Sequence, residues 1–161
     1  MSLFRAATAR QVNLGLTILR IVVGAIFVAH GAQKLFVYGF AGVTGAFGQM
    51  GVPMPGLVGP FIALLELFGG LALVFGLLTR LAALGLAFNM LGAILLVHLK
   101  GGFFLPNGAE FALSLLGGAA LLTFTGAGAF SLDALIARRE NGAVAEVSND
   151  RTRAIEGRRA A

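Results

Sequence analysis

Four long apolar stretches dominate the chain, and short polar or glycine- and proline-rich stretches separate them. They lie at about residues 14–36, 61–78, 81–99 and 109–125. A helix rises about 1.5 Å per residue, so the first stretch reaches about 33 Å, enough to cross a hydrocarbon core of about 30 Å. The pattern predicts an all-α fold, a bundle of four transmembrane helices within a membrane domain of residues 14–139.

The remaining segments are interpreted as loops and tails. Residues 1–13 are a polar, basic tail, and residues 37–60 form a glycine- and proline-rich loop with a short helix expected near Val43–Met50. Ser131 is placed to cap a short amphipathic segment that ends in Arg138 and Arg139. Residues 140–161 are polar, charged and free of aromatic residues, which predicts a disordered basic tail.

The composition supports a membrane protein. Of the 161 residues, 58% are hydrophobic and only 12% are charged, whereas a soluble domain has about 25% charged residues. Cysteine is absent, which excludes disulfides, thiol redox chemistry and cysteine-ligated metals. The first apolar run is interrupted by Arg20 and is longer than the roughly 7–15 apolar residues of a signal peptide, so we expect it to remain uncleaved.

The positive charges predict how the helices are oriented. Lysine and arginine are enriched on the cytoplasmic side of membrane proteins. With four spans, one side of the membrane receives nine of them: Arg5, Arg10, Arg80, Arg138, Arg139, Arg151, Arg153, Arg158 and Arg159. The other side receives two, Lys34 and Lys100. We therefore predict that both termini are cytoplasmic, and the net charge of +5 reflects topology and not a nucleic-acid partner.

Five ionisable residues are expected to meet in the outer half of the bundle. His30 and Lys34 end the first span, Glu66 lies in the second, His98 ends the third and Glu110 opens the fourth. Successive spans run in opposite directions, so these positions fall into one layer. Ionisable groups in a membrane face the protein interior or water and mark functional sites. We interpret the layer as a candidate polar, ligand-binding site.

Other polar and small residues have structural interpretations. Arg20 lies nearer the inner side, where we expect it to pair with Asp133 as a structural ion pair or to extend toward the cytoplasm. Asn89 is interpreted as a hydrogen bond between helices. Gly24 and Gly31 share one helix face with Arg20, which allows a neighbouring helix to approach closely.

The spacing of these residues disfavours metal sites. A carboxylate di-metal bundle needs Glu-x-x-His on two helices, but Gly69 and Leu113 stand three residues after Glu66 and Glu110. No metal is expected. Haem held between His30 and His98 is the weaker alternative to other ligands, because both histidines lie shallow.

Several motifs in order resemble the DoxX family of small bacterial membrane proteins. They are HGAQKLF at His30–Phe36, GVPMPG at Gly51–Gly56, ELFGGLALVFGLLTR from Glu66, and GAGAFSLD at Gly126–Asp133. The likeness covers about Leu14–Asp133, with Ala127 where the family often has proline. It implies a four-helix, multi-pass protein of the bacterial inner (plasma) membrane. Relatives include a subunit of an archaeal thiosulfate:quinone oxidoreductase and proteins tied to quinone or catechol resistance and to oxidative-stress complexes.

Two functions remain open at this point. In the first, the chain is a redox- or quinone-associated subunit; His30, Lys34 and His98 donate hydrogen bonds to a quinone, and Glu66 sets their charge state. In the second, it is a non-catalytic scaffold or assembly factor whose ion pairs only specify helix packing. A transporter, which would need an oligomer, is a third interpretation. Expected partners are the lipid bilayer, other redox subunits or further copies of the chain. Whether the chain is an enzyme is left open.

Overall fold

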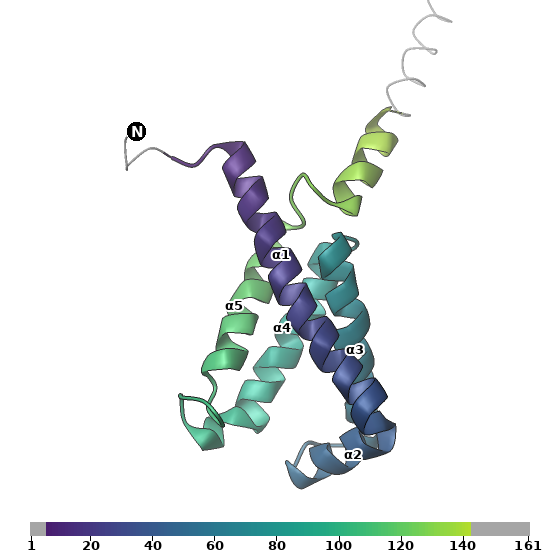
Figure 1. The fold of residues 1–161 in the computed structure, drawn as a ribbon, viewed down its shortest axis with the longest axis vertical. Coiled ribbons are helices and arrows are strands. Elements are labelled where there is room, and N and C mark those ends of the chain that lie inside the picture. The colour runs from purple at the N-terminus through teal and green to yellow at the C-terminus, as the bar shows by residue number, and fades with distance from the viewer. Residues whose placement is uncertain (1–5, 143–161) are drawn as a thin grey trace, which may run out of the picture.

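The computed structural model describes residues 6–142, and within that range the chain is helical with short connections (Figure 1). The elements in order are α1 (Ala9–Ala32), the π-helical η1 (Gln33–Tyr38), α2 (Gly39–Gln49), α3 (Pro55–Phe75), α4 (Thr79–Leu96), the 3-10 helix η2 (His98–Gly101) and α5 (Glu110–Thr125). A last helix follows at residues 132–142.

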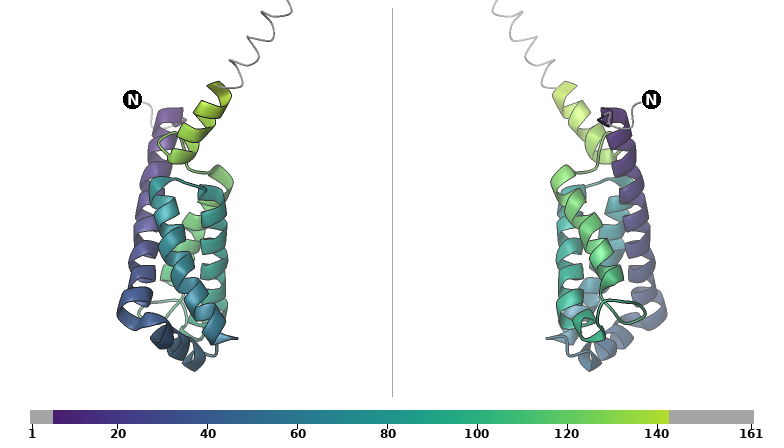
Figure 2. Two further views of the ribbon diagram at one scale, coloured as in Figure 1. Left: turned by 90° about the vertical axis from the view of Figure 1, so that its right-hand side faces the viewer. Right: turned by 90° about the vertical axis from the view of Figure 1, so that its left-hand side faces the viewer.

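Four of these helices form the bundle. α1 packs mainly on α3, α5 packs mainly on α4, and α3 joins the two pairs. The side views show the four helices next to one another along the long axis (Figure 2). Three stretches are long and apolar enough to cross a membrane, Ala9–Gln49, Pro55–Phe75 and Thr79–Leu96, and Glu110–Thr125 is a shorter apolar helix. The predicted all-α bundle is confirmed.

The helix boundaries differ from the predicted ones at several ends. α1 begins at Ala9, earlier than residue 14, because Thr8 caps it through a reciprocal capping box with Gln11. α3 begins at Pro55 and not at residue 61. α4 ends at Leu96, so His98 falls outside it.

Much of the predicted loop at residues 37–60 is helical. The short helix expected near Val43–Met50 is present as the longer α2. The chain turns at Gly39, whose φ of 64° is open to glycine without steric cost. α2 therefore leaves the line of α1 and lies across one end of the bundle (Figure 1).

Glycines set the distance between α1 and α3. A Cβ atom on Gly24 would lie 2.8 Å from the carbonyl oxygen of Gly70. A Cβ atom on Gly31 would collide with the backbone of Leu67. The two backbones are thus in contact, as small residues permit in membrane helices, and the close approach predicted for the Gly24–Gly31 face is confirmed.

The described chain begins and finishes at the same end of the bundle (Figure 1). This agrees with an even number of spans; the cytoplasmic location of that end stays a prediction from the charge bias. Ser131 caps the last helix as predicted, because its Oγ accepts the backbone N–H of Ala134 at 3.1 Å. That helix continues through residues 140–142, where a disordered tail was predicted. The rest of the predicted tail, 143–161, lies outside the described residues.

Candidate functional site

A cavity of about 780 Å³ lies inside the bundle, and residues from α2, from the connection after it and from the start of α3 form part of its wall. We call it the Glu66 cavity. Its wall is mostly apolar, with aromatic side chains from several helices. Five polar side chains line it: His30, Lys34, Glu66, Asn89 and His98. Its volume is within the range of about 300–1,000 Å³ that is usual for small-molecule sites.

Glu66 is the centre of the polar cluster. It projects from α3 and is only 3% exposed. Lys34 donates a hydrogen bond from Nζ to Glu66 Oε2, forming the only ion pair within residues 6–142. Asn89 Nδ2 donates to Glu66 Oε1 at 2.9 Å. A buried carboxylate requires such partners, because desolvation without them is costly. The cluster therefore joins α3 to η1 and to α4.

Lys34 reaches Glu66 from an unusual turn of helix. It lies in the π-helical segment Gln33–Tyr38, directly after the regular turns of α1. π-Helical turns are rare and are frequently found at functional sites. The side chain of Lys34 is 22% exposed, compared with 4% for that of Glu66. The Lys34 side chain is therefore the more accessible member of the pair.

His30 lies about one turn before Lys34 on the same helix. Its ring meets the ring of Phe111 on α5 edge to face, with centroids 6.0 Å apart. Among the described residues, no hydrogen bond engages either ring nitrogen of His30. Both nitrogens therefore remain available to a ligand in the cavity.

His98 and Glu110 differ in how they relate to the cavity. His98 lines it from η2, and its Nδ1 lies 3.3 Å from the carbonyl oxygen of Asn107. Glu110 is not among the lining residues; its Oε1 accepts the backbone N–H of Leu105 at 2.8 Å and holds the loop before α5. Four of the five predicted site residues are thus brought together, and Glu110 is not.

Asn89 is a cavity residue for which the sequence predicted only a hydrogen bond between helices. The hydrogen bond between helices is confirmed, and Asn89 also lines the cavity. In the sequence, Asn89 is a single amide in the middle of an apolar span. The one feature that could have predicted its contact with Glu66 is that the two residues lie at similar depth on adjacent antiparallel helices.

The second group of buried charges lies at the opposite end of the bundle, which we call the Arg20 end. Arg20 is 2% exposed. Its Nη1 donates to the carbonyl oxygens of Leu73 and Val74, both at 2.9 Å, and its Nη2 donates to that of Phe130 at 2.8 Å. The guanidinium thus adds to the cap at the carboxyl end of α3, where the Leu73 carbonyl also accepts the Gly76 N–H at 3.1 Å and positive charge is favourable.

Asp133 has the complementary role at the start of α4. Its carboxylate accepts the backbone N–H groups of Leu78 at 2.7 Å and Thr79 at 3.0 Å. The predicted ion pair between Arg20 and Asp133 is therefore wrong, since the Lys34–Glu66 pair is the one formed in the described part of the chain. Backbone groups at the end of α3, at the start of α4 and in the loop before the last helix bind the charges instead. The structural role expected for both residues stays a prediction.

The comparisons with known proteins agree with one another. The DoxX family model matches residues 15–99. The chain is 35% identical over 136 residues to "Putative oxidoreductase CatD" of Bacillus subtilis, covering 84% of this chain and 97% of that protein. It is 38% identical over 136 residues to the inner membrane protein YqjF of Escherichia coli, covering 79% and 95%. The inner membrane protein YphA of the same organism is 34% identical over 136 residues, covering 81% and 94%. No solved structure matches.

Proposed function

This chain belongs to the DoxX family and is a multi-pass protein of the bacterial inner membrane, and from that premise we propose that it binds the head group of a quinone in the Glu66 cavity. The observation that carries the proposal is the cavity itself. It places a polar cluster within an apolar wall, in a protein surrounded by lipid. Quinones dissolve in that lipid.

The chemistry of the cluster matches a quinone head group. Such a ring is planar and apolar, and it has two carbonyl oxygens that accept hydrogen bonds. The ammonium of Lys34 carries three donors, of which one is directed at Glu66. The ring nitrogens of His30 supply a second donor position. Glu66 holds the ammonium in place, and it can accept a hydrogen bond from a hydroquinone hydroxyl.

A redox role follows if the bound quinone is reduced. Conversion of quinone to hydroquinone consumes two electrons and two protons. The chain has no cysteine, so a thiol of this protein does not supply the electrons. We therefore assign the chain the part of a quinone-binding subunit, with a separate redox protein as the electron donor. One relative bears the name of an oxidoreductase, which is in keeping with this assignment.

The second candidate is a scaffold or assembly factor. The observation that favours it is the way the Glu66 cluster joins α3 to η1 and α4. A cluster of that kind specifies helix packing without any ligand. In that case Glu66 matters for folding and His30, which has no hydrogen-bond partner among the described residues, matters for neither folding nor binding.

Quinone retention separates the two candidates. Protein purified in mild detergent is extracted with organic solvent, and quinones are measured by mass spectrometry per mole of chain. We expect the wild type to retain quinone. His30→Leu, which loses one donor, and Glu66→Gln, which loosens the hold on the Lys34 ammonium, should each retain up to about tenfold less, as for one lost hydrogen bond. Glu110→Gln is the matched control, because Glu110 carries the same charge near the cavity without lining it, and it should retain the wild-type amount.

Two results would contradict the proposal. One is wild-type protein without quinone that also fails to take up added quinone. The other is equal retention by all four proteins. A Glu66→Gln protein that loses stability and yield while His30→Leu behaves as wild type in every assay would support the scaffold.

A further inference from the structure

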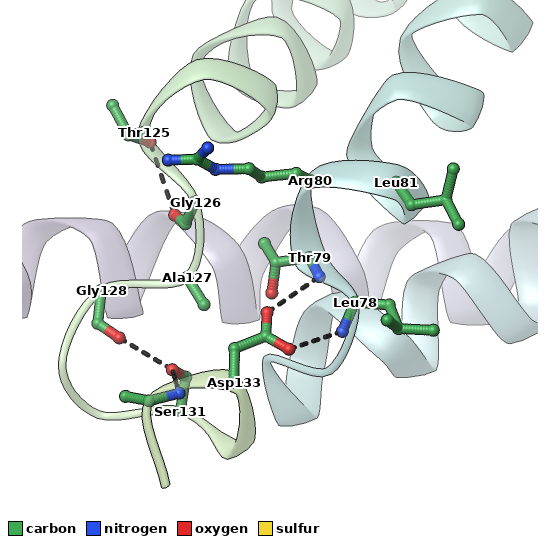
Figure 3. Close-up of a pocket in the computed structure, with 11 residues that line it drawn as sticks. Leu78, Thr79, Arg80, Leu81, Thr125, Gly126, Ala127, Gly128, Ser131 and Asp133 are labelled. Atoms are coloured by element: carbon green, nitrogen blue, oxygen red, sulfur yellow. Dashed lines mark hydrogen bonds between the residues drawn. The ribbon is translucent and has the colours of Figure 1, made fainter. Parts of the chain in front are cut away.

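A second cavity, of about 480 Å³, lies at the Arg20 end (Figure 3). Its wall is formed by two stretches that are distant in the sequence: the turn between α3 and α4, and residues 125–134, which run from the end of α5 into the first turn of the last helix. Leu78, Arg80, Gly126 and Asp133 represent these segments. The proposed quinone site uses none of these residues.

Two opposite charges line this cavity without binding each other. Arg80 is exposed, and its guanidinium extends over the turn at Thr125 and Gly126 (Figure 3). Asp133 lies on the other side and binds two backbone N–H groups. Across residues 6–142, no ion pair or hydrogen bond involves the guanidinium of Arg80. A carboxylate has about four lone-pair positions, so Asp133 can accept further hydrogen bonds.

A buried hydroxyl group is also left without a partner here. Thr79 is 0% exposed and lines the cavity. Its backbone N–H binds Asp133, but its Oγ1 has no hydrogen-bond partner. Buried polar atoms are nearly always paired, and each exception calls for an explanation. In Figure 3 the hydroxyl lies on the same side as the Asp133 carboxylate.

The position of the cavity indicates an amphiphilic ligand. The turn between α3 and α4 joins two apolar helices that are each long enough to span the membrane, so it lies at a membrane boundary. Leu78 and Leu81 line the cavity and are 63% and 67% exposed. A ligand that enters here therefore has its polar part in the cavity and its apolar part along these leucines, in the lipid.

We infer that this cavity binds the head group of a phosphatidylethanolamine molecule. Arg80 binds the phosphodiester, which suits the planar guanidinium donors. The ammonium donates to the Asp133 carboxylate and to Thr79 Oγ1. The acyl chains lie along Leu78 and Leu81. Phosphatidylglycerol lacks a cation for Asp133 and phosphatidylcholine lacks N–H donors, so neither satisfies both ends of the site.

Native mass spectrometry of the delipidated full-length protein tests the inference. Phosphatidylethanolamine, phosphatidylglycerol and phosphatidylcholine with identical acyl chains are added one at a time. We expect one phosphatidylethanolamine to bind at least about tenfold more tightly than the other two. Arg80→Gln should weaken phosphatidylethanolamine binding by at least about tenfold, as for the loss of a charged hydrogen bond to the phosphodiester. Arg138→Gln is the control, because Arg138 is on the same end without lining the cavity, and it should bind phosphatidylethanolamine as tightly as the wild type.

A second variant tests the ammonium end. Thr79→Val has nearly the shape of threonine and removes only the unpaired hydroxyl, so it should fold and should weaken phosphatidylethanolamine binding. Equal binding of the three lipids by the wild type would overturn the inference, as would an unchanged phosphatidylethanolamine affinity in Arg80→Gln. A preference for phosphatidylglycerol that falls equally in Arg80→Gln and Arg138→Gln would indicate attraction to a basic surface and would also overturn it. Glycerophosphoethanolamine, which has no acyl chains, should bind weakly; binding as tight as that of the lipid would show that the ligand is a soluble phosphodiester instead.

Discussion

The Arg20 end and the Glu66 cavity both bury charge, but different groups neutralise it. Arg20 donates to three backbone carbonyl groups, whereas Glu66 is bound by the side chains of Lys34 and Asn89. The backbone groups at the end of every α-helix need hydrogen-bond partners from outside the helix, and Arg20 supplies such a donor to α3. The Glu66 cluster, by contrast, joins side chains from the middle of the helices and not backbone groups at a helix end, and it borders a cavity.

The backbone near Arg20 supports this contrast. Leu78 has a φ of 49°, a left-handed conformation that is costly for a residue with a side chain. Its N–H group binds Asp133, which holds the turn in place. Gly76, also at positive φ, lies so close to the Arg20 guanidinium that a Cβ atom would collide with it. The turn, Arg20 and Asp133 are therefore held together, and we predict that their role is structural.

Replacing Arg20 should have the largest effect. Arg20→Met leaves one buried and two partly buried carbonyl groups without their charged donor, and at about 1.5–3 kcal/mol for each such bond we expect a loss of about 4 kcal/mol or more, with little folded protein. Unfolding in detergent by titration with SDS, followed by circular dichroism, measures the change. Arg20→Lys keeps the charge but has a shorter, single-headed donor group and should recover only part of the loss. If Arg20→Met were as stable as the wild type, the claim that Arg20 stabilises the fold through its backbone contacts would be wrong.

Replacing Lys34 should have the next largest effect, and here a second substitution should rescue it. Lys34→Met leaves the Glu66 carboxylate buried without its cation, at a cost of about 3 kcal/mol. The double variant Lys34→Met with Glu66→Gln removes both charges and should lose only about 1 kcal/mol, because replacing a whole buried pair is often nearly neutral. The same SDS titration gives the coupling energy. Simple additivity of the two single losses would show that the pair is not coupled.

The glycine contact between α1 and α3 gives a third test. Gly31→Ala places a methyl group against the backbone of Leu67, and we expect a loss of about 2 kcal/mol, as for overpacking. Gly92→Ala is the matched control, since a Cβ atom there meets nothing within 4 Å, and its stability should be equal to or slightly above that of the wild type. Equal effects of the two substitutions would contradict the close approach of α1 and α3.

The smallest effect is expected at Asp133. Asp133→Ala removes the acceptor for two N–H groups at the start of α4, a loss typical of a helix cap, about 1 kcal/mol. Asp133→Asn keeps one acceptor oxygen and should lose less. Thermal unfolding followed by circular dichroism resolves the two variants. A much larger loss in Asp133→Ala would mean that a direct charge interaction with Arg20 contributes after all.

Much of the candidate site was accessible from the sequence because membrane depth can be counted along helices. Antiparallel spans bring Lys34, Glu66 and His98 to similar levels, and all three line one cavity. Counting depth does not give side-chain direction, and Glu110 shows the consequence. It lies at the predicted level but binds Leu105 in its own loop.

The sequence by itself determined the all-helical class, the number of apolar helices and the face of α1 that packs, since each follows from hydropathy and from a fixed periodicity of 3.6 residues. The tertiary structure alone decided that Arg20 and Asp133 bind backbone groups and not each other, and that Asn89 completes the Glu66 cluster. These outcomes depend on helix ends and helix rotations. A difference of one or two residues in where a helix ends, or of part of a turn in how it faces its neighbour, changes which partner a buried charge can reach.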